Sequence, residues 1–76
     1  MKTKEKVLSQ TYLNIADIQT LLGCSWKKAK RAYTEANAID EEELRFRVEP
    51  HKVRMQTVLK ITGLNLNMLM KQQKGL

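Results

Sequence analysis

Apolar residues at helical spacing form two stripes on either side of Gly23. The first stripe consists of Ile15, Ile18, Leu21 and Leu22. The second consists of Ala29, Ala32, Tyr33 and Ala36. Spacings of three and four residues place side chains on one face of an α-helix. The pattern therefore predicts two helices, over residues 15–22 and 26–37, each with one face turned toward a core.

The boundaries of these two helices carry residues that end and begin helices. Gly23 can adopt the positive φ that closes a helix, and Ser25 is a suitable N-cap for the helix that follows. Asn14 is a second N-cap, and Asp17 three residues later completes the spacing of a capping box. Two helices joined by so tight a turn predict a helix-turn-helix, in which the second helix enters the major groove of DNA.

A third apolar pattern follows Pro50, which suits the first position of a helix. Its apolar members are Val53, Met55, Val58, Leu59 and Ile61. Because they leave only a narrow polar stripe, we expect a helix over residues 50–62 that is buried on more than one side or faces a second subunit. Gly63 ends this helix, and we expect a last helix over residues 66–74.

Residues 40–49 fit two different structures. Asp40 with Glu43 three residues later is a helix-start signature. The next side chains alternate between apolar and basic, which is the period of a half-buried strand. They are Leu44, Arg45, Phe46, Arg47 and Val48. We expect a short helical turn after Asp40 and then an extended segment over 45–49, at most a minimal strand or wing, with residues 12–14 as its partner.

The length of 76 residues predicts a single small domain. Residues 1–10 are mostly polar and carry three lysines, so we expect a flexible basic arm there. Residues 11–76 then form one helix-turn-helix domain, with a recognition unit at 14–37 and helices at 50–74 for packing or dimerisation. The expected fold class is mainly α, with about four helices.

The net charge of +6 favours a polyanionic partner. Helical geometry places three cations and a threonine on the outward face of the predicted helix over 26–37, where they can reach phosphates and base edges. These residues are Lys27, Lys30, Arg31 and Thr34. Lys28 lies to one side, and we expect it to contact the DNA backbone together with Arg47. Trp26, on the same side as Tyr33, is expected to pack at the edge of the core, with groove contact as the alternative.

The sequence offers little for other chemistry. Cys24 is the only cysteine and His51 the only histidine, so we expect neither a disulfide nor a metal site. No Gly-rich phosphate loop and no nucleophile with a plausible base is present, so we expect no cofactor and no enzymatic activity. No apolar run reaches the length of a membrane span or follows the first lysines as in a signal peptide, so we expect a cytoplasmic protein without a membrane partner.

Residues 12–62 carry several motifs in a fixed order. The motifs are Tyr12-Leu13, Leu21-Leu22-Gly23-Cys24-Ser25, the basic run from Trp26 to Tyr33, and Arg45-Phe46-Arg47-Val48-Glu49-Pro50. In this order the chain resembles the small excisionase-like and MerR-like helix-turn-helix proteins of phages and mobile elements. The resemblance implies sequence-specific DNA binding, often as a dimer or cooperative oligomer, and a role in transcription regulation or in directing recombination.

The expected function is therefore sequence-specific binding of double-stranded DNA, by a small transcriptional regulator or an excisionase-like factor. A homodimer would double the readout, and an aliphatic patch on the last two helices is the expected interface. That patch consists of Val58, Leu59, Leu66, Leu69 and Met70. The alternative is a protein-interaction module acting on a host regulator or polymerase, which the broadly apolar helix and the acidic residues 40–43 favour. RNA binding is a weaker third interpretation, because the interleaved aromatic residues of a stacking platform are missing.

Overall fold

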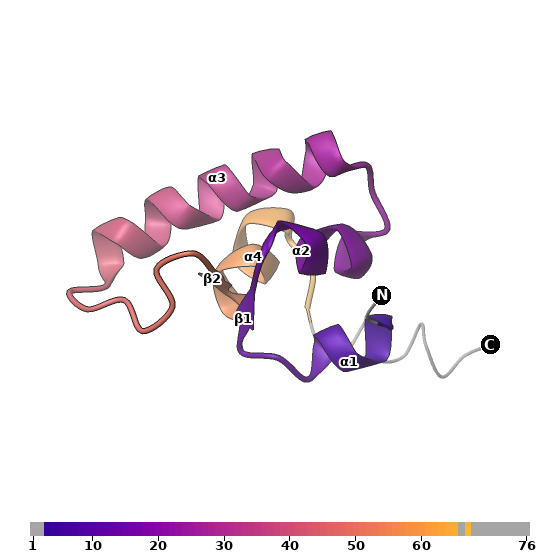
Figure 1. Ribbon diagram of the computed structural model, residues 1–76, viewed down its shortest axis with the longest axis horizontal. Helices are drawn as coiled ribbons and strands as arrows, with labels where there is room; N and C mark the ends of the chain where they lie inside the picture. Colours follow the sequence, from indigo (N-terminus) through magenta and orange to yellow (C-terminus); the bar gives the residue numbers. More distant parts are fainter. Residues whose placement is uncertain (1–2, 66, 68–76) are drawn as a thin grey trace.

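Four helices and a two-stranded antiparallel sheet make up the part of the chain that the computed structural model describes, residues 3–65 and 67 (Figure 1). In chain order the elements are α1 (Lys4–Leu8), β1 (Tyr12–Leu13), α2 (Ile15–Leu22), α3 (Trp26–Glu43), β2 (Val53–Arg54) and α4 (Met55–Thr62). The expected mainly α fold class is confirmed. The predicted helix over 66–74 lies outside the described residues apart from Asn67.

The predicted starts of the two helices and the turn between them are confirmed. Asn14 Oδ1 accepts from the backbone N–H of Asp17 at 2.8 Å, and Asp17 Oδ2 accepts from the N–H of Asn14 at 3.1 Å, which is the reciprocal capping box. Gly23 ends α2 with a φ of 62°, a conformation that side chains with a Cβ rarely adopt. Ser25 Oγ then accepts from the N–H of Lys28 at 3.3 Å and caps α3.

The core lies between α3 and the shorter elements. α3 runs along one side of the molecule, and both α2 and α4 pack against its inner face (Figure 1). The fully buried residues of α3 on this face include Ala29 and Ala36, whose small side chains let the other helices approach closely. The remaining buried apolar side chains are Val7, Leu13, Ile18, Leu21, Val53, Met55 and Val58.

The N-terminal segment differs from the expected flexible arm, because it contains the helix α1. Thr3 caps this helix by accepting from the N–H of Lys6 at 3.2 Å. Val7 is fully buried and Leu8 packs against the core, so these two apolar residues anchor the segment beside α2. Burial of this apolar pair supplies a driving force that the polar composition of the segment did not indicate.

The expectation that a new helical turn begins after Asp40 is wrong. α3 continues through Asp40 to Glu43, and the Asp40 carboxylate is buried at the N-terminus of α4. Its oxygens accept from the backbone N–H of Arg54 at 2.9 Å, from Arg54 Nε at 2.9 Å and from Thr57 Oγ1 at 2.6 Å. The N-cap residue of α4 makes no side-chain capping bond of its own. Asp40 instead holds the start of α4 against α3, through the backbone and guanidinium of Arg54 and the hydroxyl of Thr57.

The strand and the third predicted helix also begin later than expected. Residues 45–49 contain no strand; β2 lies at Val53–Arg54 and pairs with the predicted partner segment, Tyr12 opposite Arg54 and Leu13 opposite Val53. The helix expected to start at Pro50 starts at Met55, because the residues between them form a turn and then β2. Hydrogen bonding of β2 to β1 therefore overrides the helix-start signal of proline.

Candidate nucleic-acid interface

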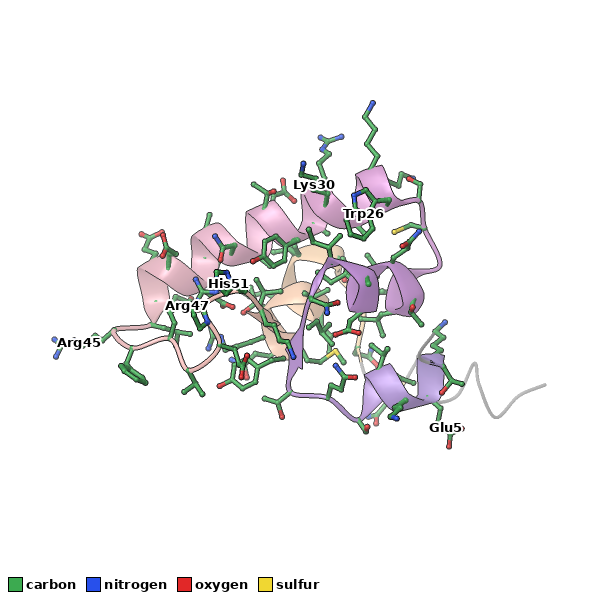
Figure 2. The ribbon with its side chains drawn as sticks, viewed as in Figure 1. Glu5, Trp26, Lys30, Arg45, Arg47 and His51 are labelled. Atoms are coloured by element: carbon green, nitrogen blue, oxygen red, sulfur yellow. The ribbon has the colours of Figure 1, made fainter. Side chains whose placement is uncertain are left out.

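The N-terminal half of α3 exposes a cluster of basic side chains, which we call the basic cluster. Its four members are Lys27, Lys28, Lys30 and Arg31, and all are exposed. Thr34, one turn further on, is exposed as well. The opposite side of the helix carries the buried Ala29, so the cluster faces away from the core as predicted. In Figure 2 the side chain of Lys30 extends outward from α3.

No member of the basic cluster is used by the fold within residues 3–65 and 67. None of its charged groups forms an ion pair or a hydrogen bond there, whereas the Arg54 guanidinium contacts Asp40 at 2.9 Å and Glu43 at 2.7 Å. Thr34 donates its hydroxyl to the carbonyl of Lys30 at 2.9 Å, so its oxygen remains available only as an acceptor. The cluster therefore presents uncompensated positive charge to solvent.

The helix dipole makes this arrangement unfavourable for the fold alone. The N-terminus of a helix carries a partial positive charge, so cations there are repelled and anions are attracted. α3 nevertheless has Lys27 and Lys28 in its first turn and no acidic residue there. The same dipole adds to the field of the four cations, and together they form an end of the helix that attracts anions such as phosphate.

The C-terminal half of α3 has the opposite charge. Its exposed face carries acidic side chains, namely Glu35, Glu41, Glu42 and Glu43. The helix that was predicted over 26–37 continues to Glu43, and its additional turns are acidic. Phosphates would be repelled by this half, so only the N-terminal half of α3 is suited to lie in a groove of DNA.

Arg47 is not brought to the basic cluster. Its Nη1 donates to Asn37 Oδ1 at 2.9 Å and its Nη2 to the carbonyl oxygen of Lys52 at 2.8 Å, and the side chain is only 13% exposed. Figure 2 places Arg47 beside the C-terminal half of α3, whereas Lys30 lies toward the N-terminus. The guanidinium therefore ties the loop after α3 to that helix, and it is not free for the backbone contact expected from the sequence.

The same loop reverses the expected alternation of buried and exposed side chains. Phe46 is 79% exposed and Val48 is 64% exposed, while Arg47 between them points inward. Arg45 extends away from the body of the molecule (Figure 2). The acceptors on Asn37 and Lys52 hold the Arg47 guanidinium inside the loop, so the side chains of Phe46 and Val48 point outward. The loop tip is thus an exposed apolar surface with acidic residues of α3 nearby.

The pKa of Asp40 shows how firmly the acidic half of α3 is tied to the fold. Burial alone would raise this pKa. The hydrogen bonds from Thr57 and from the backbone and guanidinium of Arg54 outweigh that effect and hold the pKa below its ordinary value of 3.8. In return, Asp40 and then Glu43 raise the pKa of Arg54. Asp40 is therefore ionised and structural.

Trp26 is more exposed than a residue packed at the core edge. Its side chain is 51% exposed at the first position of α3. It lines an open hollow of about 310 Å³ between the start of α3, the start of α2 and the loop before β2. The other lining residues are Asn14, Ile15, Ala16, Tyr33 and His51. The sequence placed Trp26 and Tyr33 on one side correctly, but it could not indicate how much of the indole is left uncovered.

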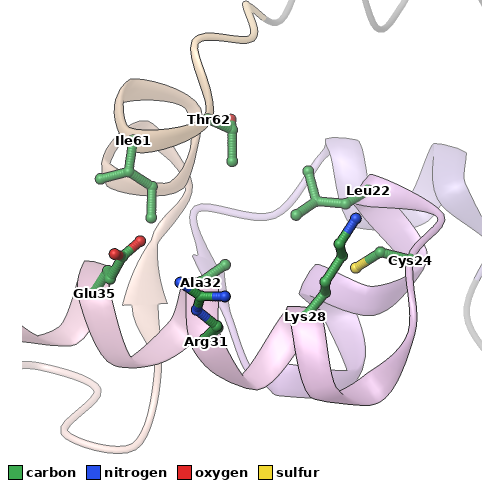
Figure 3. Close-up of a pocket in the computed structure, with 8 residues that line it drawn as sticks. All are labelled: Leu22, Cys24, Lys28, Arg31, Ala32, Glu35, Ile61 and Thr62. Carbon is green, nitrogen blue, oxygen red and sulfur yellow. The ribbon is translucent and has the colours of Figure 1, made fainter.

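A second hollow lies on the other flank of α3 (Figure 3). It measures about 370 Å³ and is lined by Leu22, Cys24, Lys28, Arg31, Ala32, Glu35, Ile61 and Thr62. Lys28 and Glu35 are of opposite charge, so this flank has no uniform electrostatic character. Within residues 3–65 and 67 there is no cluster of three or more acidic, histidine or cysteine side chains that could hold a metal ion. None of the helices described could cross a bilayer.

Comparison with known proteins leaves the chain without an identified relative. No protein-family model, no curated protein and no solved structure matches it. The likeness of residues 12–62 to excisionase-like and MerR-like proteins therefore rests on its motifs alone.

Proposed function

We propose that the protein binds double-stranded DNA and that the N-terminal half of α3 enters the major groove. The observation that carries this proposal is the basic cluster. Four cations stand at the positively charged end of a helix, directly after a helix-turn-helix turn, and none has a partner among the described residues. A charged surface that contributes nothing to the fold, and opposes the helix dipole, is best explained by an anionic ligand.

Individual roles follow from side-chain chemistry. Arg31 and Lys30 have the donors that pair with the O6 and N7 acceptors of guanine, the most common specific contact in the major groove. Thr34 can only accept, which suits the exocyclic amino group of cytosine or adenine. Lys27 and Lys28, in the first turn, are placed for phosphates at the groove edge.

The acidic half of α3 fixes the direction of docking. At a rise of 1.5 Å per residue, the helix is about 27 Å long, more than twice the width of the major groove. Glu41, Glu42 and Glu43 at the far end would meet phosphates if the helix lay flat along the groove. We therefore expect α3 to enter by its N-terminal end and to leave with its acidic end pointing away from the duplex.

A cytoplasmic role as a small transcriptional regulator or an excisionase-like factor fits this mode of binding. One short recognition helix reads only a few base pairs, so a homodimer or cooperative assembly would provide the missing specificity. Val58 is fully buried and Leu59 is partly buried, so Val58 is not available for the expected dimer interface. Its remaining members, Leu66, Leu69 and Met70, lie outside the described residues.

The proposal is tested by removing the outward cations. Lys27, Lys30 and Arg31 are replaced together by alanine, and binding to a fluorescently labelled mixed-sequence duplex is measured by anisotropy at low salt. We expect at least a hundredfold loss of affinity with an unchanged circular dichroism spectrum. A matched control replaces Lys4, Lys6 and Lys60, which removes the same charge from α1 and α4. If both triple variants lose affinity equally, or neither does, the basic cluster is not the interface.

A protein-interaction module is the second candidate, and the exposed loop tip favours it. Phe46 and Val48 are two of the three large apolar side chains that the described residues expose. An exposed apolar patch is typical of a protein contact. The same titration separates the two functions: no salt-dependent binding of duplex DNA at low salt would support the module and contradict the DNA proposal.

A further inference from the structure

Among the described residues, Trp26 is the one exposed large apolar side chain at the end of α3 that carries the basic cluster. It is half exposed and is the only tryptophan of the chain. The other exposed large apolar residues, Phe46 and Val48, belong to the loop at the opposite end of α3. Leaving an indole in water forgoes a large part of its burial energy. Its exposure beside four unpaired cations requires its own explanation.

Helix geometry places Trp26 beside Lys30, at the edge of the face that is expected to read bases. Trp26 and Lys30 are four residues apart, so their side chains are neighbours on the helix surface. Figure 2 shows the ring of Trp26 on the side of α3 that faces α2, whereas Lys30 extends outward. When Lys30 lies at a base edge, the exposed part of the indole is expected at the margin of the same groove.

The Trp26 side chain lines the hollow between the starts of α2 and α3. Trp26 shares its lining with Ile15, Ala16 and Tyr33, which are contributed by the first turn of α2 and the second turn of α3. Tyr33 is itself packed against the core. The ring therefore borders protein on one side and leaves about half of its surface free for a contact.

We propose that Trp26 is a specificity-determining residue that packs against the C5-methyl group of thymine; this rests on the DNA-binding function proposed above. In the major groove the thymine methyl is the only apolar feature of the base edges, and apolar side chains distinguish thymine by contact with it. Insertion of the ring between bases is a minor-groove mechanism. A single-strand platform would need several exposed aromatic residues in a basic groove, whereas Tyr33 is largely packed.

The test compares two duplexes that differ only in this methyl group. One mixed-sequence duplex contains thymine, and the other has the same sequence with deoxyuridine at every thymine. The wild type is expected to bind the thymine duplex about fourfold more tightly for each methyl group covered, the ratio that burial of one such group gives. Trp26→Ala is expected to bind both duplexes equally, and Trp26→Phe to keep most of the preference.

The two duplexes distinguish a missing thymine contact from a missing affinity for DNA. If the wild type binds both duplexes with the same affinity, or if Trp26→Ala keeps the preference, Trp26 does not read thymine although the protein binds DNA. If the wild type binds neither duplex at low salt, both proposals are wrong. Because Trp26 is the only tryptophan, its fluorescence provides a second measurement: an emission spectrum unchanged at saturating DNA would also contradict the contact.

Discussion

The two halves of α3 differ in what their charges do. In the C-terminal half, acidic side chains hold other elements: Asp40 and Glu43 bind Arg54 at the start of α4, and Glu41 lies 3.9 Å from Arg47 in the loop. In the N-terminal half, no charged group of the basic cluster forms an ion pair or a hydrogen bond with another described residue. The charges at one end of the helix thus support the fold, and the charges at the other end are left for a ligand.

The largest predicted effect belongs to the acidic half. Asp40→Asn removes the charge that satisfies Arg54 and the N-terminus of α4, and we expect it to lower the free energy of unfolding by about 2–3 kcal/mol. Urea denaturation measures this change. Glu42→Gln, two residues away and exposed, removes the same charge without breaking a described contact. A loss as large for Glu42→Gln as for Asp40→Asn would show that net charge, and not the buried network, decides stability.

The same network predicts how stability depends on pH. The pKa of Asp40 is lower in the folded chain than its ordinary value of 3.8. As the pH falls through the region below about 4, the unfolded chain takes up the proton first, so the free energy of unfolding decreases. The contribution of Asp40 is therefore complete above the unfolded pKa and is lost as the pH falls through the folded pKa. The stability difference between wild type and Asp40→Asn should shrink over this range; a constant difference would contradict it.

A smaller effect is expected where the loop joins α3. Arg47→Met removes the hydrogen bonds to Asn37 and Lys52, and we expect a loss of about 1–2 kcal/mol in stability. The salt dependence of DNA binding should not change, because Arg47 is engaged within the protein. Arg45→Met is the matched control, since it removes the same charge from an exposed neighbour. A reduced salt slope for Arg47→Met alone would restore Arg47 to the DNA interface.

The smallest effect is opposite in sign. Lys27→Gln combined with Lys28→Gln removes two cations from the positive end of the helix dipole, and we expect stability to rise by about 0.3–1 kcal/mol at low salt. Thermal melting measures the change, and the increase should fade at high salt because the dipole interaction is screened. A lower melting temperature would mean that these lysines support the fold through contacts that the structure does not contain.

Local signals were sufficient for the helix pair. Asn14, Asp17, Gly23 and Ser25 act within a few residues of their own positions, and each behaves as its sequence context predicts. The outward direction of Lys30 and Arg31 also follows from helical periodicity alone. The fold class and most of the basic cluster were therefore accessible from the sequence.

Long-range contacts decided the parts that the sequence did not predict. Asp40 has the local signature of a helix start, but a partner fourteen residues later uses its carboxylate. Arg47 follows the alternation of an outward strand residue, but Asn37 and the carbonyl of Lys52 provide acceptors that turn it inward. Neither partner can be identified from spacing, because both depend on how the loop folds back onto α3.

The most direct test of the basic half of α3 is the salt dependence of DNA binding. If Lys27 and Lys28, the two cations placed for phosphates, each release one counterion, the plot of log K against log salt for the wild type has a slope of about −1.8. Lys27→Ala is predicted to reduce this slope to about −0.9. Lys60→Ala changes an exposed lysine of α4 whose Nζ lies 3.9 Å from Glu43, and it is predicted to leave the slope unchanged. A wild-type slope near zero, or an equal reduction by Lys60→Ala, would contradict the assignment of the basic cluster as the DNA interface.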